Sequence, residues 1–122
     1  MKNYTLEVCV DSVESALAAE NGGANRLELC SGLVIGGLTP SPSLFSALKN
    51  HCNIKIHVLI RPRFGDFCYS DGEFANILED VKLFQSLGGD GVVIGCLLPD
   101  GELDVKRLQI LKEAAGSMSI TL

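Results

Sequence analysis

The sequence Leu6-Glu7-Val8-Cys9 is repeated further along the chain as Leu27-Glu28-Leu29-Cys30. Both segments predict short β-strands, because strand-forming residues alternate with polar ones along them. On each strand the leucine and valine side chains lie on one face, and the glutamate and the cysteine lie on the other. The chain is therefore expected to carry two strands that each end in a thiol.

Outward from this repeat, strand and helix patterns alternate along the whole chain. Strands are expected at residues 4–10, 25–30, 54–60, 90–95 and 118–122. Four helices are expected between them, with N-caps at Asp11 (Glu14 completing a capping box), Ser41, Ser70 and Asp104. Helices placed between successive strands are typical of right-handed crossovers in a parallel α/β sheet. We interpret residues 1–122 as one domain.

Two ways of closing such a sheet fit the pattern. A doubly wound open sheet of five strands would be complete at 122 residues. A TIM barrel needs about 250 residues, so this chain would supply about five strands and four helices of it. Doubly wound strands are usually apolar on both faces. Glu7 and Glu28 therefore favour strands that line a barrel interior.

The charge balance makes two classes of partner improbable. The chain has 10 Lys and Arg against 15 Asp and Glu, a net charge of −5. This acidic excess argues against nucleic-acid binding and against attraction to an anionic membrane. We also find no apolar run long enough to span a bilayer and no signal-peptide core near the N-terminus. The expected location is the cytosol or the nucleus.

The five cysteines are better read by position than by number. They form no C-x-x-C pair, and His51 and His57 complete no zinc-finger spacing. Without a secretory signal we expect reduced thiols. Cysteines 9, 30, 68 and 96 fall at or just beyond the carboxyl ends of strands, where active sites of parallel α/β proteins gather, and Cys52 lies at the opposite end.

Cys9 and Cys30 are the candidate metal ligands. Soft thiolates select Cu(I). The two cysteines hold matching positions on strands that lie about 4.8 Å apart before any barrel stagger. A two-sulfur site is feasible there, and the alternative is a pair of small buried cysteines without a ligand.

The candidate anion site lies at the same sheet edge. Arg61 and Arg63 follow the third strand and are expected either to neutralise Glu7 and Glu28 or to hold a carboxylate or phosphate. Hydroxyls of Thr39 and Ser41 precede a helix N-terminus and are further candidate anion ligands. The alternative is turn and capping duty alone, because no nucleotide-binding motif is present.

An enzyme remains open as a second function class. Glu7 or Glu28 would act as acid or base on a small anionic substrate held by Arg61 and Arg63. No Ser-His-Asp or Cys-His arrangement is evident, and His57 is interpreted as a core histidine.

Several ordered motifs together resemble the CutC copper-homeostasis family. They are residues 6–16, 26–30, 36–41, 60–63, 65–71, 90–95 and 100–101. The resemblance implies a TIM-type barrel, intracellular copper handling, association into homo-oligomers and Cu(I) ligands at Cys9 and Cys30. Cys68 and Cys96 are weaker candidates, as third ligands. The family implies no settled reaction.

The resemblance covers only the N-terminal part of the family's barrel. In the family, the strand matching residues 119–122 continues into a His-Arg-Ala-Phe-Asp segment and the remaining strands. A half barrel exposes two sheet edges and an apolar face, which predicts self-association. A third hypothesis is therefore a fragment without a function of its own, or an interaction module, that is stable only as an oligomer.

Overall fold

Strands and helices alternate as the sequence predicts. The computed structural model describes residues 3–122. In this part of the chain the elements are β1 (Glu7–Val10), α1 (Val13–Asn21), β2 (Arg26–Leu29), the 3-10 turn η1 (Leu33–Ile35), α2 (Pro42–His51), β3 (Lys55–Leu59), α3 (Asp71–Ser86), β4 (Gly91–Val93), α4 (Val105–Ala115) and β5 (Ser119–Thr121). Each strand is shorter than its predicted range, because pairing stops where the chain turns into the next loop.

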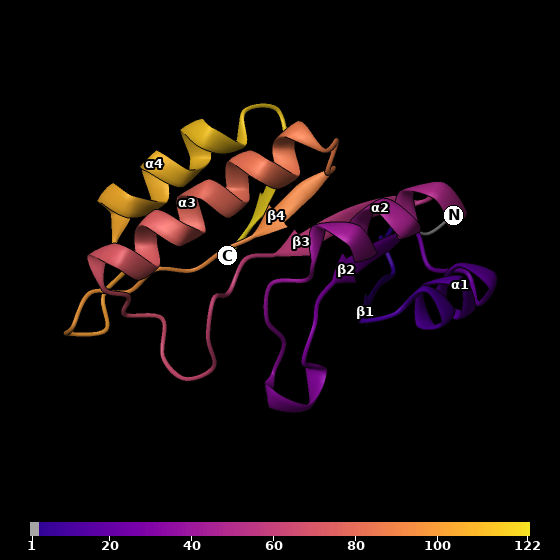
Figure 1. The fold of residues 1–122 in the computed structure, drawn as a ribbon, viewed down its shortest axis with the longest axis horizontal. Helices are drawn as coiled ribbons and strands as arrows, with labels where there is room; N and C mark the ends of the chain where they lie inside the picture. Colours follow the sequence, from indigo (N-terminus) through magenta and orange to yellow (C-terminus); the bar gives the residue numbers. More distant parts are fainter. Residues whose placement is uncertain (1–2) are drawn as a thin grey trace.

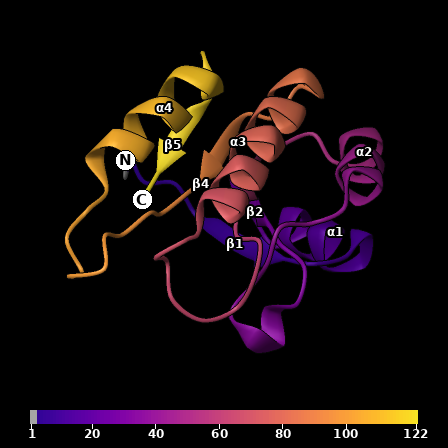
Figure 2. The ribbon, with the colours of Figure 1, turned by 60° about the vertical axis from the view of Figure 1, so that its left-hand side comes forward.

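The five strands form one parallel sheet in the order β1-β2-β3-β4-β5. The helices follow one another along one side of the sheet, α1 and α2 beside β1 and β2 and α3 and α4 beside β4 and β5 (Figure 1). The turned view in Figure 2 shows the helices as an outer arc around the strands. The opposite face of the sheet is left without helices in the described residues, as in an opened barrel.

Three of the four predicted helix N-caps are confirmed, and the first is wrong. Ser41, Ser70 and Asp104 each accept a hydrogen bond from a backbone N–H in the first turn. At α1 the N-cap is Ser12 rather than Asp11, and Ser15 replaces Glu14 in the capping box. A serine hydroxyl can donate and accept at once. The Ser12–Ser15 pair therefore closes the box one residue later than the acidic pair would.

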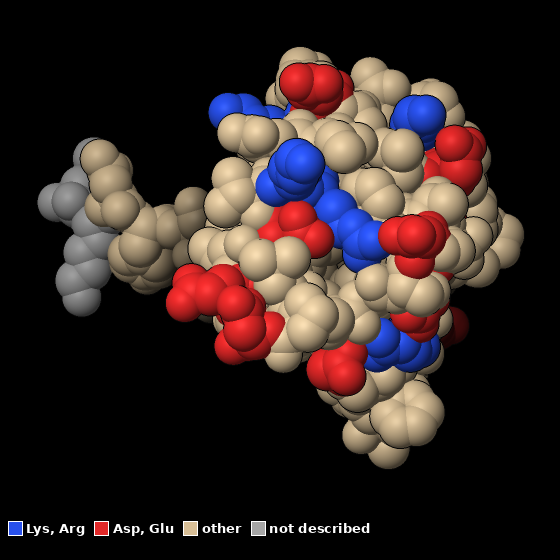
Figure 3. All heavy atoms as spheres, turned by 90° about the vertical axis from the view of Figure 1, so that its left-hand side faces the viewer, with Lys and Arg blue, Asp and Glu red and all other residues tan. Residues whose placement is uncertain are grey.

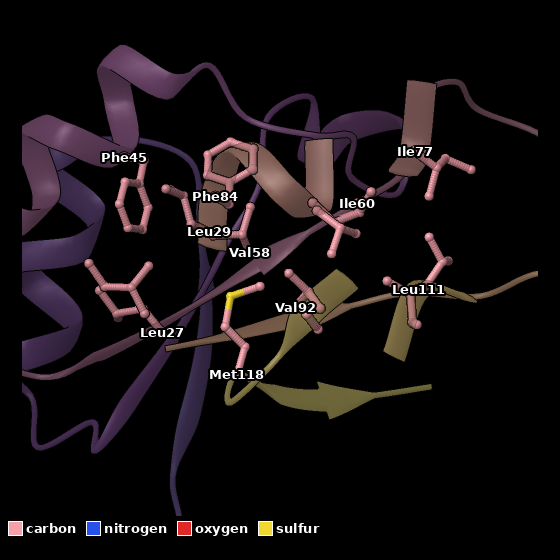
Figure 4. Close-up of a cluster of buried hydrophobic side chains, with 14 of the residues drawn as sticks. Leu27, Leu29, Phe45, Val58, Ile60, Ile77, Phe84, Val92, Leu111 and Met118 are labelled. Carbon is pink, nitrogen blue, oxygen red and sulfur yellow. The ribbon is translucent and has the colours of Figure 1, made fainter. Parts of the chain in front are cut away.

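The core lies between the helices and the outward face of the sheet. Figure 4 shows strand residues such as Leu27, Leu29 and Val58 meeting Phe45 from α2 and Phe84 from α3. The two aromatic rings pack edge-on, with centroids 5.6 Å apart. Within β1 and β2 the apolar side chains lie on the helix-covered face, as predicted. Leu6, which precedes β1, is the exception, because its side chain is 44% exposed.

The inward face of the sheet is polar over β1, β2 and the first half of β3. Strand pairing sets Glu7 beside Arg26, and Cys9, Glu28 and His57 follow one another across β1, β2 and β3. His57 is only 2% exposed, so it is buried as expected, although it lies on the inward face and outside the hydrophobic core between the sheet and the helices. Its ring fits against Gly91, where an added Cβ would lie 2.7 Å from ring atoms.

Candidate functional site

The register between β1 and β2 places Cys9 beside Glu28. The expected side-by-side placement of Cys9 and Cys30 is therefore wrong by two residues. The stagger between the two strands causes this offset, because Cys30 follows β2 while Cys9 lies within β1. Sequence periodicity assigns each side chain to a face and leaves this shift undetermined.

Glu28 nevertheless brings the two thiols together. Cys9 Sγ lies 2.8 Å from Glu28 Oε2 and donates a hydrogen bond to it. Cys30 Sγ lies 3.9 Å from the same oxygen and 3.6 Å from the Glu28 carbonyl oxygen. Both sulfur atoms therefore lie around one carboxylate oxygen, on the helix-free face of the sheet.

The two thiols differ in their access to solvent. Cys9 is exposed, whereas Cys30 is 1% exposed. The loop after β2 covers Cys30, and a Cβ added at Gly37 would lie 3.6 Å from its Sγ and 2.8 Å from Leu59. The Gly37 backbone has φ +92°, a conformation that favours glycine. Glycine at this position thus lets the loop close over the second sulfur.

Burial and Glu28 keep both thiols protonated near neutral pH. Desolvation, followed by the hydrogen bond to Glu28, raises the pKa of Cys9 to about 11. Desolvation and the charge of Glu28 raise the pKa of Cys30 to about 12. A metal that binds both sulfur atoms as thiolates must therefore displace two protons.

Arg26 is the cation that the sequence analysis missed. It forms an ion pair with Glu7, with Nε 2.7 Å from Oε1. Of the two roles expected for Arg61 and Arg63, neutralising the strand carboxylates is wrong, because neither has an ion pair with Glu7 or Glu28 among the described residues. The other expected role, holding an anion, stays a prediction. The missed signal was the position of Arg26, two residues before Glu28 and therefore on the same strand face.

Arg61 joins the loop after β2 to the loop after β3. Its guanidinium donates to the carbonyl oxygens of Gly37 at 3.0 Å and Gly65 at 2.9 Å, and its backbone N–H donates to Thr39 Oγ1 at 2.8 Å. The guanidinium also lies over the Phe67 ring, 5.3 Å from its centroid. Arg61 and Thr39 therefore hold the loop after β2 against the loop after β3 at the carboxyl ends of the strands.

The Arg63 side chain is engaged by partners in its own loop and in the first turn of α3. It forms ion pairs with Asp66 and Glu73 and donates to the Cys68 carbonyl oxygen at 3.1 Å. A backbone hydrogen bond from Ser70, and then the bond from Arg63, lowers the pKa of Glu73. On the face shown in Figure 3, basic side chains similarly lie next to acidic ones rather than forming a broad basic area.

The remaining predicted site residues lie apart from the thiol pair. Ser41 caps α2 by accepting from the Leu44 N–H at 3.2 Å. Cys68 is half-buried in the loop after β3, and Cys96, 1% exposed, belongs to the core beneath the helices. Within residues 3–122 no group of three or more His, Cys, Asp or Glu side chains is arranged to hold a metal ion.

Comparison with known proteins places the chain in a family. A family model described as the CutC family matches residues 4–122. The chain belongs to the CutC family. A CutC family protein from Bacteroides fragilis (strain YCH46) is 48% identical over 122 residues, covering 99% of this chain and 49% of the relative. One from Salmonella paratyphi B is 47% identical over 116 residues, covering 95% of this chain and 47% of the relative.

Solved structures support the fold of this CutC family chain. A CutC from Streptococcus agalactiae, provisionally described as a copper homeostasis protein, superposes with a TM-score of 0.85 at 28% identity, covering 96% of this chain and 58% of that one. A provisionally described phosphonomutase from Burkholderia cenocepacia has a TM-score of 0.59 at 19% identity, covering 91% and 46%. At that identity it shows the fold alone. The predicted fold class, a partial TIM-type barrel, is confirmed.

The chain spans about half the length of the curated CutC relatives that it matches. The activity of a whole CutC protein is therefore carried over to this chain only as a proposal. In the described part of the chain, no helix is both long and apolar enough to cross a membrane.

Proposed function

We propose that this CutC family chain takes part in copper homeostasis by binding one Cu(I) ion between the thiolates of Cys9 and Cys30. The observation that carries the proposal is the convergence of both sulfur atoms on Glu28 Oε2, at 2.8 and 3.9 Å. The provisional description of the S. agalactiae protein as a copper homeostasis protein supports the general role in copper homeostasis.

The donor set fits Cu(I) better than other common metals. Soft thiolates select Cu(I). A structural Zn²⁺ site needs four ligands, and the described residues offer no cluster of three. A pair of sulfur atoms without further ligands suits Cu(I), because Cu(I) can be held by two thiolate ligands.

The unequal exposure of the two thiols suits the uptake and release of the ion. Exposed Cys9 would meet an incoming Cu(I) donor first, and buried Cys30 would complete the coordination under the loop that Gly37 closes. Both pKa values lie above the physiological range, so binding releases protons and strengthens as the pH rises.

Anaerobic titration with Cu(I) against a strong competing chelator, with reductant present, tests the proposal. Cys9→Ser and Cys30→Ser should each abolish the tight site in the 122-residue chain. Cys68→Ser is the matched control, because Cys68 lies in a different loop, and it should retain the site. Unchanged affinity in both Cys9→Ser and Cys30→Ser would reject the proposal.

We further propose that the chain self-associates, as the sequence analysis expects. β1 and β5 are the two ends of the strand order, and apolar side chains near β5 are exposed, Leu122 to 71% and Ile120 to 36%. Sedimentation velocity across a hundredfold range of protein concentration tests this proposal. A single monomeric species throughout would contradict it.

A further inference from the structure

A hollow lies at the carboxyl ends of β3 and β4, apart from the thiol pair. Its volume is about 320 Å³, within the range of small-molecule sites. Most of its wall is apolar and includes Leu59, Val93, Phe67, Leu103 and Leu122. Neither Cys9 nor Cys30 contributes to this wall. Loop-rich strand ends of this kind are where parallel α/β proteins bind their ligands.

Among the described residues that line this hollow, Arg61 alone has a charged side chain. The other three arginines of the chain, Arg26, Arg63 and Arg107, each have a carboxylate within 4.0 Å. Arg61 has no such partner among the described residues. A half-buried guanidinium without a counter-charge favours the approach of an anion.

The hydrogen bonds of Arg61 keep its charge in place. Two carbonyl oxygens accept from it at 2.9 and 3.0 Å, and Phe67 lies against its guanidinium. The contact from Nη1 to the Ile35 carbonyl oxygen is longer, at 3.4 Å, and lies at the exposed side. An incoming carboxylate can replace that weak contact without freeing the side chain from the loops.

We propose that this hollow binds a small molecule with an apolar body and one carboxylate. The apolar body packs against Leu59, Val93 and Phe67, and the carboxylate meets the guanidinium of Arg61. A free phosphate would leave the apolar wall unfilled, and an uncharged apolar molecule would leave Arg61 without a counter-charge. The proposal goes beyond copper binding, because it involves different residues and a different class of ligand.

Benzoate and benzamide form a matched pair of probes, because they share shape and differ in charge. Their dissociation constants would be measured by chemical-shift titration of the isotope-labelled 122-residue chain. Benzoate should bind at least tenfold more tightly and should shift the amide signals of Gly95 and Leu97, which border the hollow. Equal affinity for the two probes, no binding, or shifts confined to other regions would overturn the proposal.

Gly95→Val tests the location of the site. A Cβ at Gly95 would lie 3.6 Å from the Phe67 ring, an ordinary contact, and valine would therefore occupy the hollow without a clash at that atom. Gly72→Ala is the control, because a Cβ there meets only Ser70 Oγ at 3.9 Å. Gly95→Val should weaken benzoate binding at least tenfold, and Gly72→Ala should leave it unchanged. Undiminished benzoate binding by Gly95→Val would place the ligand elsewhere and overturn the proposal. The preference for benzoate over benzamide tests the proposal in the parent chain, without any substitution.

Discussion

Cys9 and Glu28 face each other across the β1–β2 pair, with the thiol hydrogen-bonded to the carboxylate at 2.8 Å. The same carboxylate oxygen lies near Cys30. Burial and, after it, the nearby Glu28 carboxylate raise the pKa of both thiols. The reactivity of the two thiols therefore depends in part on this one acidic side chain.

Glu28→Gln should lower the pKa of Cys9, because the substitution removes the negative charge that disfavours the thiolate. The rate of alkylation of Cys9 by iodoacetamide at pH 8, followed by peptide mass spectrometry, should rise. A fall of one pKa unit would raise the rate about tenfold. Glu14→Gln, on the exposed side of α1, should leave the rate unchanged. An equal rate in Glu28→Gln and the parent chain would remove Glu28 from this role.

Cys30 should make the chain less stable in alkali. Its folded pKa is raised to about 12 from the ordinary value of 9.0, chiefly by burial, so the folded state favours the protonated thiol. The protonated Cys30 thiol makes its full contribution to the free energy of unfolding below pH 9, the ordinary pKa of the thiol. This contribution is lost as the pH rises toward 12, the pKa of Cys30 in the folded chain. In urea unfolding between pH 8 and pH 11, the parent should lose more stability than Cys30→Ser. Parallel pH profiles would contradict this prediction.

Gly91→Ala should destabilise the sheet, because the new Cβ would lie 2.7 Å from the buried His57 ring. Overpacking of this kind costs about 1–3 kcal/mol. His57→Ala should relieve the clash, so the double variant should lose less stability than the two single losses added together. Urea unfolding of the four proteins measures this coupling. Strict additivity would show that the ring and the glycine do not interact.

Phe84→Ala should cost about 3–5 kcal/mol, because Phe84 is fully buried and packs edge-on against Phe45. Leu83→Ala is the adjacent control on the same helix. Leu83 is 38% exposed, so its truncation should cost much less. Chemical denaturation compares the two variants. Similar losses would mean that the helix does not present Phe84 to the core as described.

Much of the fold follows from local patterns in the sequence. Ser70, with Glu73 three residues later, predicts the start of α3, and both capping hydrogen bonds are present. At α1 the predicted N-cap, Asp11, is wrong by one residue: Asp and Ser are both favoured at this position, and the backbone path makes Ser12 the cap. The hydrogen bonds that start a helix join residues within one turn, so helix starts can be predicted from the sequence to within a residue.

The geometry of the candidate sites could be predicted from the sequence only in part. The repeat predicts that Glu28 and both cysteines share the inward face, and the structure confirms this placement. Register and loop closure are non-local: they set Cys9 beside Glu28 and fold Gly37 over Cys30. The partners of the arginines are also set by non-local structure: strand register places Arg26, rather than Arg61, beside Glu7.

The sequence by itself determined the alternation of strands and helices and the face of each strand on which Glu7, Cys9 and Glu28 lie, because these depend on periods of two and 3.6 residues. Only the tertiary structure decided that both sulfur atoms lie near one oxygen of Glu28. It also decided that Arg61 has no carboxylate partner among residues 3–122. These relationships join segments that are distant in the chain. Their geometry depends on the stagger of strands and the path of loops, which no local pattern encodes.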